Sequence, residues 1–173
     1  MGILGRGNAM GSPVQKHEVQ IANDLFWVSG VLETLGNPHH YINQDGLDFL
    51  HINEAHVVPW SFSGLPASRP EMINMASERI QFLLFAQEAS LTEFRAAPNT
   101  MPIILHLPLA IVRGAIPLLS EAKIHNFLDF WKGRFFPVVD AEIYPLTDCA
   151  VQLPSKSRLA YINRRSIQSY VPA

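Results

Sequence analysis

Four of the seven histidines lie close together between residues 39 and 56: His39, His40, His51 and His56. Imidazole rings are common metal ligands, but a metal site needs several ligands to converge at about 2 Å from one ion. Two of these histidines are adjacent and the other two are five residues apart, and on a regular strand both spacings point the rings to opposite faces. The pattern favours surface or hydrogen-bonded histidines, and we expect neither a metal nor a cofactor.

Carboxylates are the next candidates for chemistry, as general acids or bases. Glu54 and Asp140 each directly precede an alanine that opens an apolar run. A carboxylate in that place can accept hydrogen bonds from nearby backbone N–H groups, which favours a structural role in a turn. The sequence has no nucleotide-binding glycine loop, hydrolase serine motif, paired cysteines or zinc-binding helix motif. We therefore expect no catalytic residue and a protein that is not an enzyme.

The single cysteine, Cys149, follows Asp148 at the end of a strand-like run. One cysteine cannot form a disulfide within the chain, which fits a reducing compartment, so we expect a cytoplasmic protein. A buried, inert thiol is favoured over a nucleophile at this position.

One group of residues combines positive charge with aromatic rings: Arg158, Tyr161, Arg164 and Arg165. Arginines and aromatic rings together can stack on the bases of single-stranded RNA. The whole chain carries a formal net charge of −2, however, and lacks the basic footprint of a nucleic-acid binder. RNA binding is therefore an alternative function rather than the leading one, and these four residues are its candidate contacts.

The composition points instead to protein partners. Apolar residues make up 48% of the chain and charged residues only 16%, below the roughly 25% that is usual for soluble domains. So few charged residues favour a protein whose surface is partly covered by another subunit over a small, rather apolar monomer. Aromatic residues are enriched at interface cores, although core packing fits them equally well. The candidates are Phe26, Trp27, Trp60, Phe130 and Trp131.

Two segments bear on membranes and targeting. The most apolar window, 101–119, is interrupted by prolines, a histidine and an arginine. A bilayer span needs about 20 mostly apolar residues without such groups, so the window predicts a pair of buried strands and no membrane span. The N-terminus lacks the apolar core of a signal peptide, and residues 1–16 are expected to form a flexible arm.

Short apolar runs separated by 13 prolines and 10 glycines predict an all-β protein with short strands and one or two short helices. Two stretches resemble each other: 28–32 with 49–59, and 112–116 with 135–145. Their alignment pairs Gly30 with Gly114 and Glu54 with Asp140. It predicts a duplicated unit, with repeats at 17–85 and 101–173 joined by a linker at 86–100. One larger barrel with coincidental similarity is the alternative.

The segments between the matched blocks differ. Ser120 is a candidate helix cap, and Ile124, Phe127, Leu128 and Trp131 follow at helical spacing, which predicts about three turns of helix. The corresponding place in the first repeat, 37–43, holds Pro38 and is expected to be a loop. A further short helix is expected within the linker, at 87–97.

The order of these elements resembles the Sm-like fold, a five-stranded and strongly bent barrel. Gly30 and Gly114 match the glycine of the bent second strand, and segments 75–80 and 162–167 match the last hairpin. The stretch 125–129 followed by 135–144 is similar to uncharacterised bacterial Sm-like proteins. The resemblance implies two tandem Sm-like barrels with exposed edge strands. Such edges pair with neighbours.

The sequence thus predicts a non-enzymatic assembly, scaffold or interaction subunit with a protein partner, either as a homo-oligomer such as a dimer or ring or as a subunit of a larger complex. An RNA-binding Sm-like protein and a small-barrel enzyme or flavin binder are the alternatives.

Overall fold

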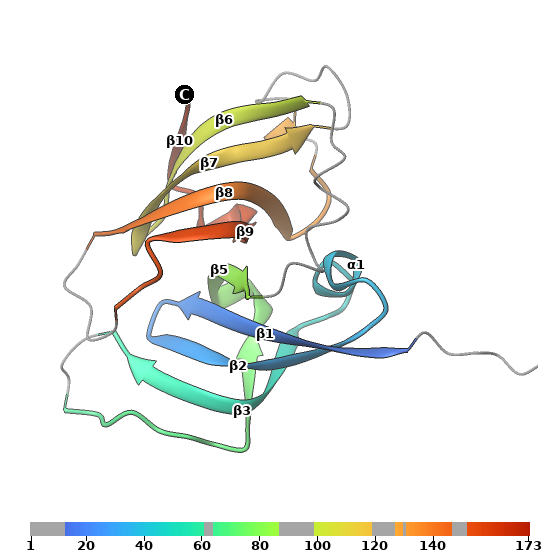
Figure 1. The fold of residues 1–173 in the computed structure, drawn as a ribbon, viewed down its shortest axis with the longest axis vertical. Coiled ribbons are helices and arrows are strands. Elements are labelled where there is room, and N and C mark those ends of the chain that lie inside the picture. Colours follow the sequence, from blue (N-terminus) through green and yellow to red (C-terminus); the bar gives the residue numbers. More distant parts are fainter. Residues whose placement is uncertain (1–12, 61–63, 87–98, 119–126, 130, 147–151) are drawn as a thin grey trace, which may run out of the picture.

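The protein is described by a computed structural model over residues 13–60, 64–86, 99–118, 127–129, 131–146 and 152–173. It is all-β, and all ten strands form one antiparallel sheet that curves into two layers (Figure 1). The strands are β1 (Val14–Asn23), β2 (Phe26–Leu35), β3 (Phe49–Pro59), β4 (Met72–Ala76), β5 (Ile80–Phe85), β6 (Asn99–His106), β7 (Ala110–Leu118), β8 (Phe135–Pro145), β9 (Lys156–Asn163) and β10 (Ser169–Pro172). The short helices are α1 (Pro38–Ile42) and the 3₁₀ turns η1 (Ser77–Arg79) and η3 (Arg164–Ser166).

The two halves of the sheet repeat one strand order. The first half runs β5-β1-β2-β3-β4 and the second runs β10-β6-β7-β8-β9. The strand registers also agree between the halves. Leu83 of β5 opposes Ile21 of β1, and the equivalent residues of the second half, Tyr170 of β10 and Leu105 of β6, oppose each other in the same way. The sheet is open, and within the described residues β4 and β10 are its unpaired ends.

Each half bends at the glycine that the sequence alignment paired. The β2–β3 register shifts at Gly30, and the β7–β8 register shifts at Gly114. A Cβ atom on Gly30 would lie 2.6 Å from the carbonyl oxygen of Asn53, and one on Gly114 would lie 2.9 Å from that of Val139. The close approach of the neighbouring backbone therefore requires a residue without a side chain.

The partner strand of each glycine carries a matching irregularity. Glu54 in β3 and Asp140 in β8 both have a φ angle of 50°, in the left-handed region. Aspartate is more frequent in this conformation than most other residues are. Both carboxylates therefore lie at backbone bulges. This position agrees with the structural role that the sequence analysis favoured over catalysis.

The two halves meet where β5 pairs with β9, with Phe82 opposite Ile162, Leu83 opposite Tyr161 and Leu84 opposite Ala160. Successive side chains of a strand point to opposite faces, so these strands contribute to both hydrophobic cores. The core built mainly from the first half receives Leu83, Phe85, Leu159 and Tyr161. The core built mainly from the second half receives Phe82, Leu84, Ala160 and Ile162.

Two expectations need correction. Strand β1 begins at Val14, which pairs with Leu35, so residues 14–16 belong to the sheet and not to an arm. Segment 37–43 was expected to be a loop but contains helix α1.

Helix α1 forms because Pro38 occupies its first turn, where the missing N–H is no loss. The Asn37 side chain caps it by accepting from the backbone N–H groups of His39 and His40. The predicted helix around 121–131 is described only at 127–129, which is helical, and at Trp131, whose N–H donates to the Phe127 carbonyl. The expected helix at 87–97 and Cys149 lie outside the described residues.

The described part of the apolar window, 101–118, contributes to β6 and β7, as the interrupted pattern predicted. No helix in the described ranges has the length and apolar character needed to cross a membrane.

The bend can be tested by adding a side chain to it. We expect Gly30→Val and Gly114→Val each to lower the free energy of unfolding by about 1–3 kcal/mol, because overpacking forces the backbone apart. Urea unfolding followed by circular dichroism measures this. Glu33→Ala on the same strand removes only a surface ion pair with Lys16 and should change little. Unchanged stability in both valine variants would contradict the steric argument.

A second prediction concerns His17 of β1, which is buried and edge-on to Phe85. Its Nε2 lies 3.1 Å from the Thr34 hydroxyl, which donates to the Gly36 carbonyl. Burial lowers the pKa of His17 below 6.5. The unfolded chain therefore binds this proton more readily, and the stability gained from neutral His17 is present above pH 6.5 and lost as the pH falls below it. We expect His17→Gln to lose less stability than the natural chain between pH 8 and pH 5 in thermal melts. Equal losses would contradict this assignment.

Candidate functional site

The aromatic residues that were candidate contacts for another subunit mostly serve the contact between the two halves. Trp27 and Trp60 are only 5% and 6% exposed, and they pack edge-to-face with ring centroids 5.9 Å apart. Both belong to the core of the second half, beside Phe82. Their burial leaves little surface for a partner chain, so core packing is the correct interpretation of these two residues.

The remaining candidates lie at different depths. Phe26 is half-buried against the first core. Trp131 is half-buried, and its ring contacts that of His39 from α1 at a centroid distance of 5.9 Å. Its indole N–H donates to the Phe135 carbonyl at 3.2 Å. Phe130 lies outside the described residues.

The candidate RNA contacts do not form one surface. Tyr161 is fully buried, and its ring stacks on His39 with centroids 5.6 Å apart, so its faces are closed to a nucleotide base. Arg158 is exposed on β9, whereas Arg164 and Arg165 are exposed on η3 beyond the end of that strand. The structure therefore corrects the base-stacking role expected of Tyr161.

The rings of His39 and His40 contact each other, with centroids 5.6 Å apart. His39 packs against Trp131 and Tyr161, and the Nδ1 atom of His51 contacts the side-chain oxygen of Asn74 on β4. No group of three or more potential metal-binding side chains occurs among the residues that the structure describes.

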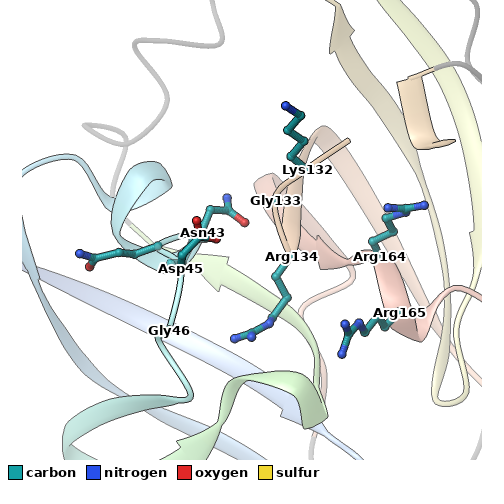
Figure 2. A pocket seen from close by; sticks show the side chains of 10 residues that line it. Asn43, Asp45, Gly46, Lys132, Gly133, Arg134, Arg164 and Arg165 are labelled. Atoms are coloured by element: carbon teal, nitrogen blue, oxygen red, sulfur yellow. The ribbon is translucent and has the colours of Figure 1, made fainter. Parts of the chain in front are cut away.

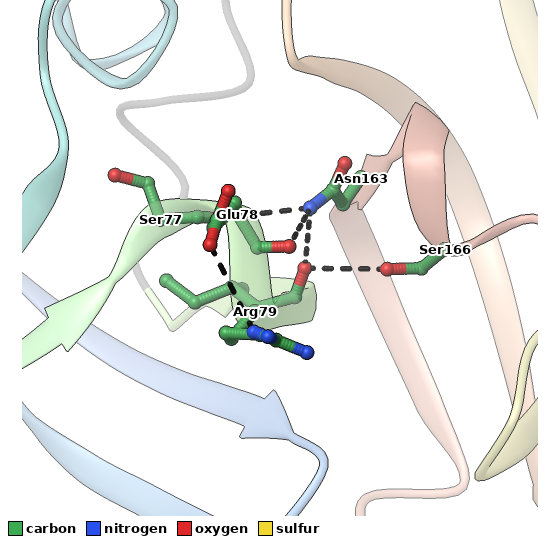
Figure 3. Close-up of polar contacts among 6 residues, drawn as sticks. Ser77, Glu78, Arg79, Asn163 and Ser166 are labelled. Carbon is green, nitrogen blue, oxygen red and sulfur yellow. Dashed lines mark hydrogen bonds and ion pairs between the residues drawn. The ribbon is translucent and has the colours of Figure 1, made fainter.

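The polar side chain that joins the two halves most closely is Asn163, at the end of β9 (Figure 3). It is fully buried, and its amide donates to the carbonyls of Ile80 at 2.7 Å, Glu78 at 3.2 Å and Ser77 at 3.5 Å. Its oxygen accepts from the Arg165 N–H at 3.0 Å and so caps η3. One side chain thus holds both hairpin turns in place.

A second buried amide, Gln81, bridges the halves from the start of β5. Its nitrogen donates to the Asp24 carboxylate at 2.8 Å, and its oxygen accepts from the Leu109 N–H at 3.2 Å. Nothing in the sequence indicated that Gln81 is buried. Burial of a polar residue depends on which strands meet, and that is a tertiary feature.

The two ends of the sheet carry apolar side chains. Met72 on β4 is 49% exposed and Val171 on β10 is 47% exposed. Unpaired backbone groups and apolar side chains together form a surface suited to another strand. These edges are the first candidate site of the molecule.

A pocket at the junction of the halves is the second candidate site (Figure 2). One wall is the loop that follows α1, and the other combines the segment before β8 with η3. Asn43 holds the walls together, because its amide donates to the Phe135 carbonyl at 2.9 Å and its oxygen accepts from the Phe135 N–H at 2.7 Å. A Cβ atom at Gly133 would lie 2.7 Å from that oxygen, so the contact requires glycine.

Comparison of the chain with known protein families, with characterised proteins and with solved structures finds no match. Function must therefore be argued from the two candidate sites themselves.

The role of Asn163 can be tested directly. We expect Asn163→Ala to lower the free energy of unfolding by about 1–3 kcal/mol, since it leaves buried carbonyls without a donor. Ser166→Ala is the matched control, because it removes only one 3.4 Å hydrogen bond to Ile80 and should cost less. Urea unfolding curves measure both, and a larger loss in the serine variant would contradict this role.

Proposed function

We propose that this chain is a non-enzymatic assembly subunit, made of two tandem Sm-like units, that joins copies of itself edge to edge. The observation that supports the proposal is the β5–β9 junction. It pairs the last strand of one half with the fourth strand of the other. The edges left open are the last strand of the second half, β10, and the fourth strand of the first half, β4. The same two kinds of edge that join within the chain are thus available between chains.

The internal junction also predicts the register between chains. Turn η1 corresponds to η3, so Leu83 and Leu84 correspond to Tyr170 and Val171. Likewise, Tyr161 and Ala160 of β9 correspond to Asn74 and Ile73 of β4. Leu83 opposes Tyr161 and Leu84 opposes Ala160 within the chain. Between chains, Tyr170 should therefore oppose Asn74 and Val171 should oppose Ile73.

The junction between chains should be weaker than the one within the chain. Ala76 stands where Asn163 stands in the second half, since both precede a 3₁₀ turn at the end of the equivalent strand. Alanine offers no amide to the carbonyls of a neighbouring turn. Chains would be held together by backbone pairing and apolar contacts, without hydrogen bonds equivalent to those of Asn163. This favours reversible association.

Edge-to-edge association can be tested by placing a charge on one edge. We expect the natural chain to show a mass above that of one chain in light scattering at high concentration. Val171→Lys should reduce it to a single chain, because a charged side chain blocks strand pairing. Leu25→Lys, in the β1–β2 turn at a residue 65% exposed, is the matched control and should leave assembly unchanged. A single-chain mass for the natural protein at all concentrations would contradict the proposal.

The register can be tested by cross-linking. We expect Asn74→Cys with Tyr170→Cys, in a Cys149→Ser background, to form disulfide-linked multimers on non-reducing gels. Opposed residues in antiparallel strands have Cα atoms about 4.5–5.5 Å apart, within reach of a disulfide. Met72→Cys with Tyr170→Cys is two residues out of register and should link far less. A disulfide within one chain, or equal linking by both pairs, would contradict the register.

A further inference from the structure

The pocket at the junction of the halves carries an excess of positive charge. Its volume is about 510 Å³, within the range of small-molecule sites. Four cationic side chains and one carboxylate line it, a surplus of three positive charges on a chain whose net charge is −2. The charged residues are Lys132, Arg134, Arg164, Arg165 and Asp45.

Two of the arginines are held in place without being neutralised. Arg134 donates to the Leu47 carbonyl at 2.8 Å. Arg164 donates to the Trp131 carbonyl at 3.2 Å and to the Asp129 carbonyl at 3.4 Å. Carbonyl oxygens orient a guanidinium group but carry no net charge, so both side chains keep their full attraction for an anion.

The other two cations are unpaired. Within the described part of the chain, the side chains of Lys132 and Arg165 have no hydrogen bond or ion pair, and both residues are exposed. Figure 2 shows the Arg134 and Arg165 side chains, from different segments, reaching into the lower part of the view, whereas Lys132 and Arg164 extend upward. Arg134 and Arg165 line the same pocket, so both can contact one ligand.

The first half carries less positive charge at its corresponding corner, where Arg79 of η1 forms an ion pair with Glu78 at 3.8 Å. The strands after each loop begin at Phe49 and Phe135, so Asp48 corresponds to Arg134. When η1 is aligned with η3, Glu78 takes the position of Arg165. The basic corner is therefore a property of one half only and does not follow from the repeated fold.

We propose that this pocket binds a compact ligand bearing two or more phosphoryl groups. Guanidinium groups match phosphate oxygens in geometry and bind them by charge-assisted hydrogen bonds. A compact ligand is favoured over a nucleic-acid strand because none of the residues that line the pocket is aromatic, which leaves no platform for base stacking. The walls come from one chain, so binding does not require assembly.

The test is a calorimetric titration of the full chain with sodium tripolyphosphate, at a protein concentration where light scattering gives a single-chain mass. We expect one site per chain. Lys132→Glu and Arg165→Glu should each weaken binding at least about tenfold, and both should fold normally because neither side chain makes a hydrogen bond or ion pair in the described part of the chain. Arg69→Glu makes the same charge change at an exposed residue that is not among those lining the pocket, and it should alter binding less than about twofold.

Three outcomes would overturn the proposal. The first is no heat of binding at millimolar tripolyphosphate. The second is an equal loss in Arg69→Glu, which would indicate nonspecific attraction. The third is tighter binding of a ten-nucleotide single-stranded RNA than of tripolyphosphate, with loss in the same two pocket variants, which would replace the compact ligand by a nucleic acid. Because the titration is performed on single chains, its failure would leave the assembly proposal untouched.

Discussion

The structure depends on one constraint: β5 and β9 are shared by two hydrophobic cores. Phe82 and Leu84 point into one core while Leu83 and Phe85 point into the other. Full burial of such a side chain contributes about 1.5–3 kcal/mol, and each half alone would expose the side chains that serve its partner. The halves therefore stabilise each other through the same strands that connect them, and neither is expected to be stable in isolation.

The shared strands also explain where polar residues can be buried. A side chain at the end of β9 faces the turn before β5, so Asn163 can satisfy three carbonyls at once. The same proximity sets the loop after α1 against the segment before β8, where Asn43 and Gly133 fit together. The Asn163 hydrogen bonds and the basic pocket thus both result from the junction between the halves, and they are not independent features of two domains.

Sequence reasoning predicted the all-β class, and the matched pairs Gly30 with Gly114 and Glu54 with Asp140 occupy equivalent bends in the structure. These residues were identifiable because a backbone that bends sharply restricts which residue types fit. Helix α1 was missed because Pro38 also suits the first turn of a helix. The pocket could not be predicted, since Arg134 and Arg165 are 31 positions apart and meet only through the fold.

The differences between the halves bear on how chains would meet. Within the chain, Arg134 reaches the Leu47 carbonyl across the junction. In the repeat, Asp48 of the first half is equivalent to Arg134, and Gly133 of the second half is equivalent to Leu47. If chains join as proposed, Asp48 of one copy would therefore approach the basic segment around Gly133 of the next copy. Opposite charges would then meet at the contact between chains, which favours head-to-tail pairing of β10 with β4. The absence of an asparagine at Ala76 would be partly offset by this attraction, and the association should weaken as salt screens it.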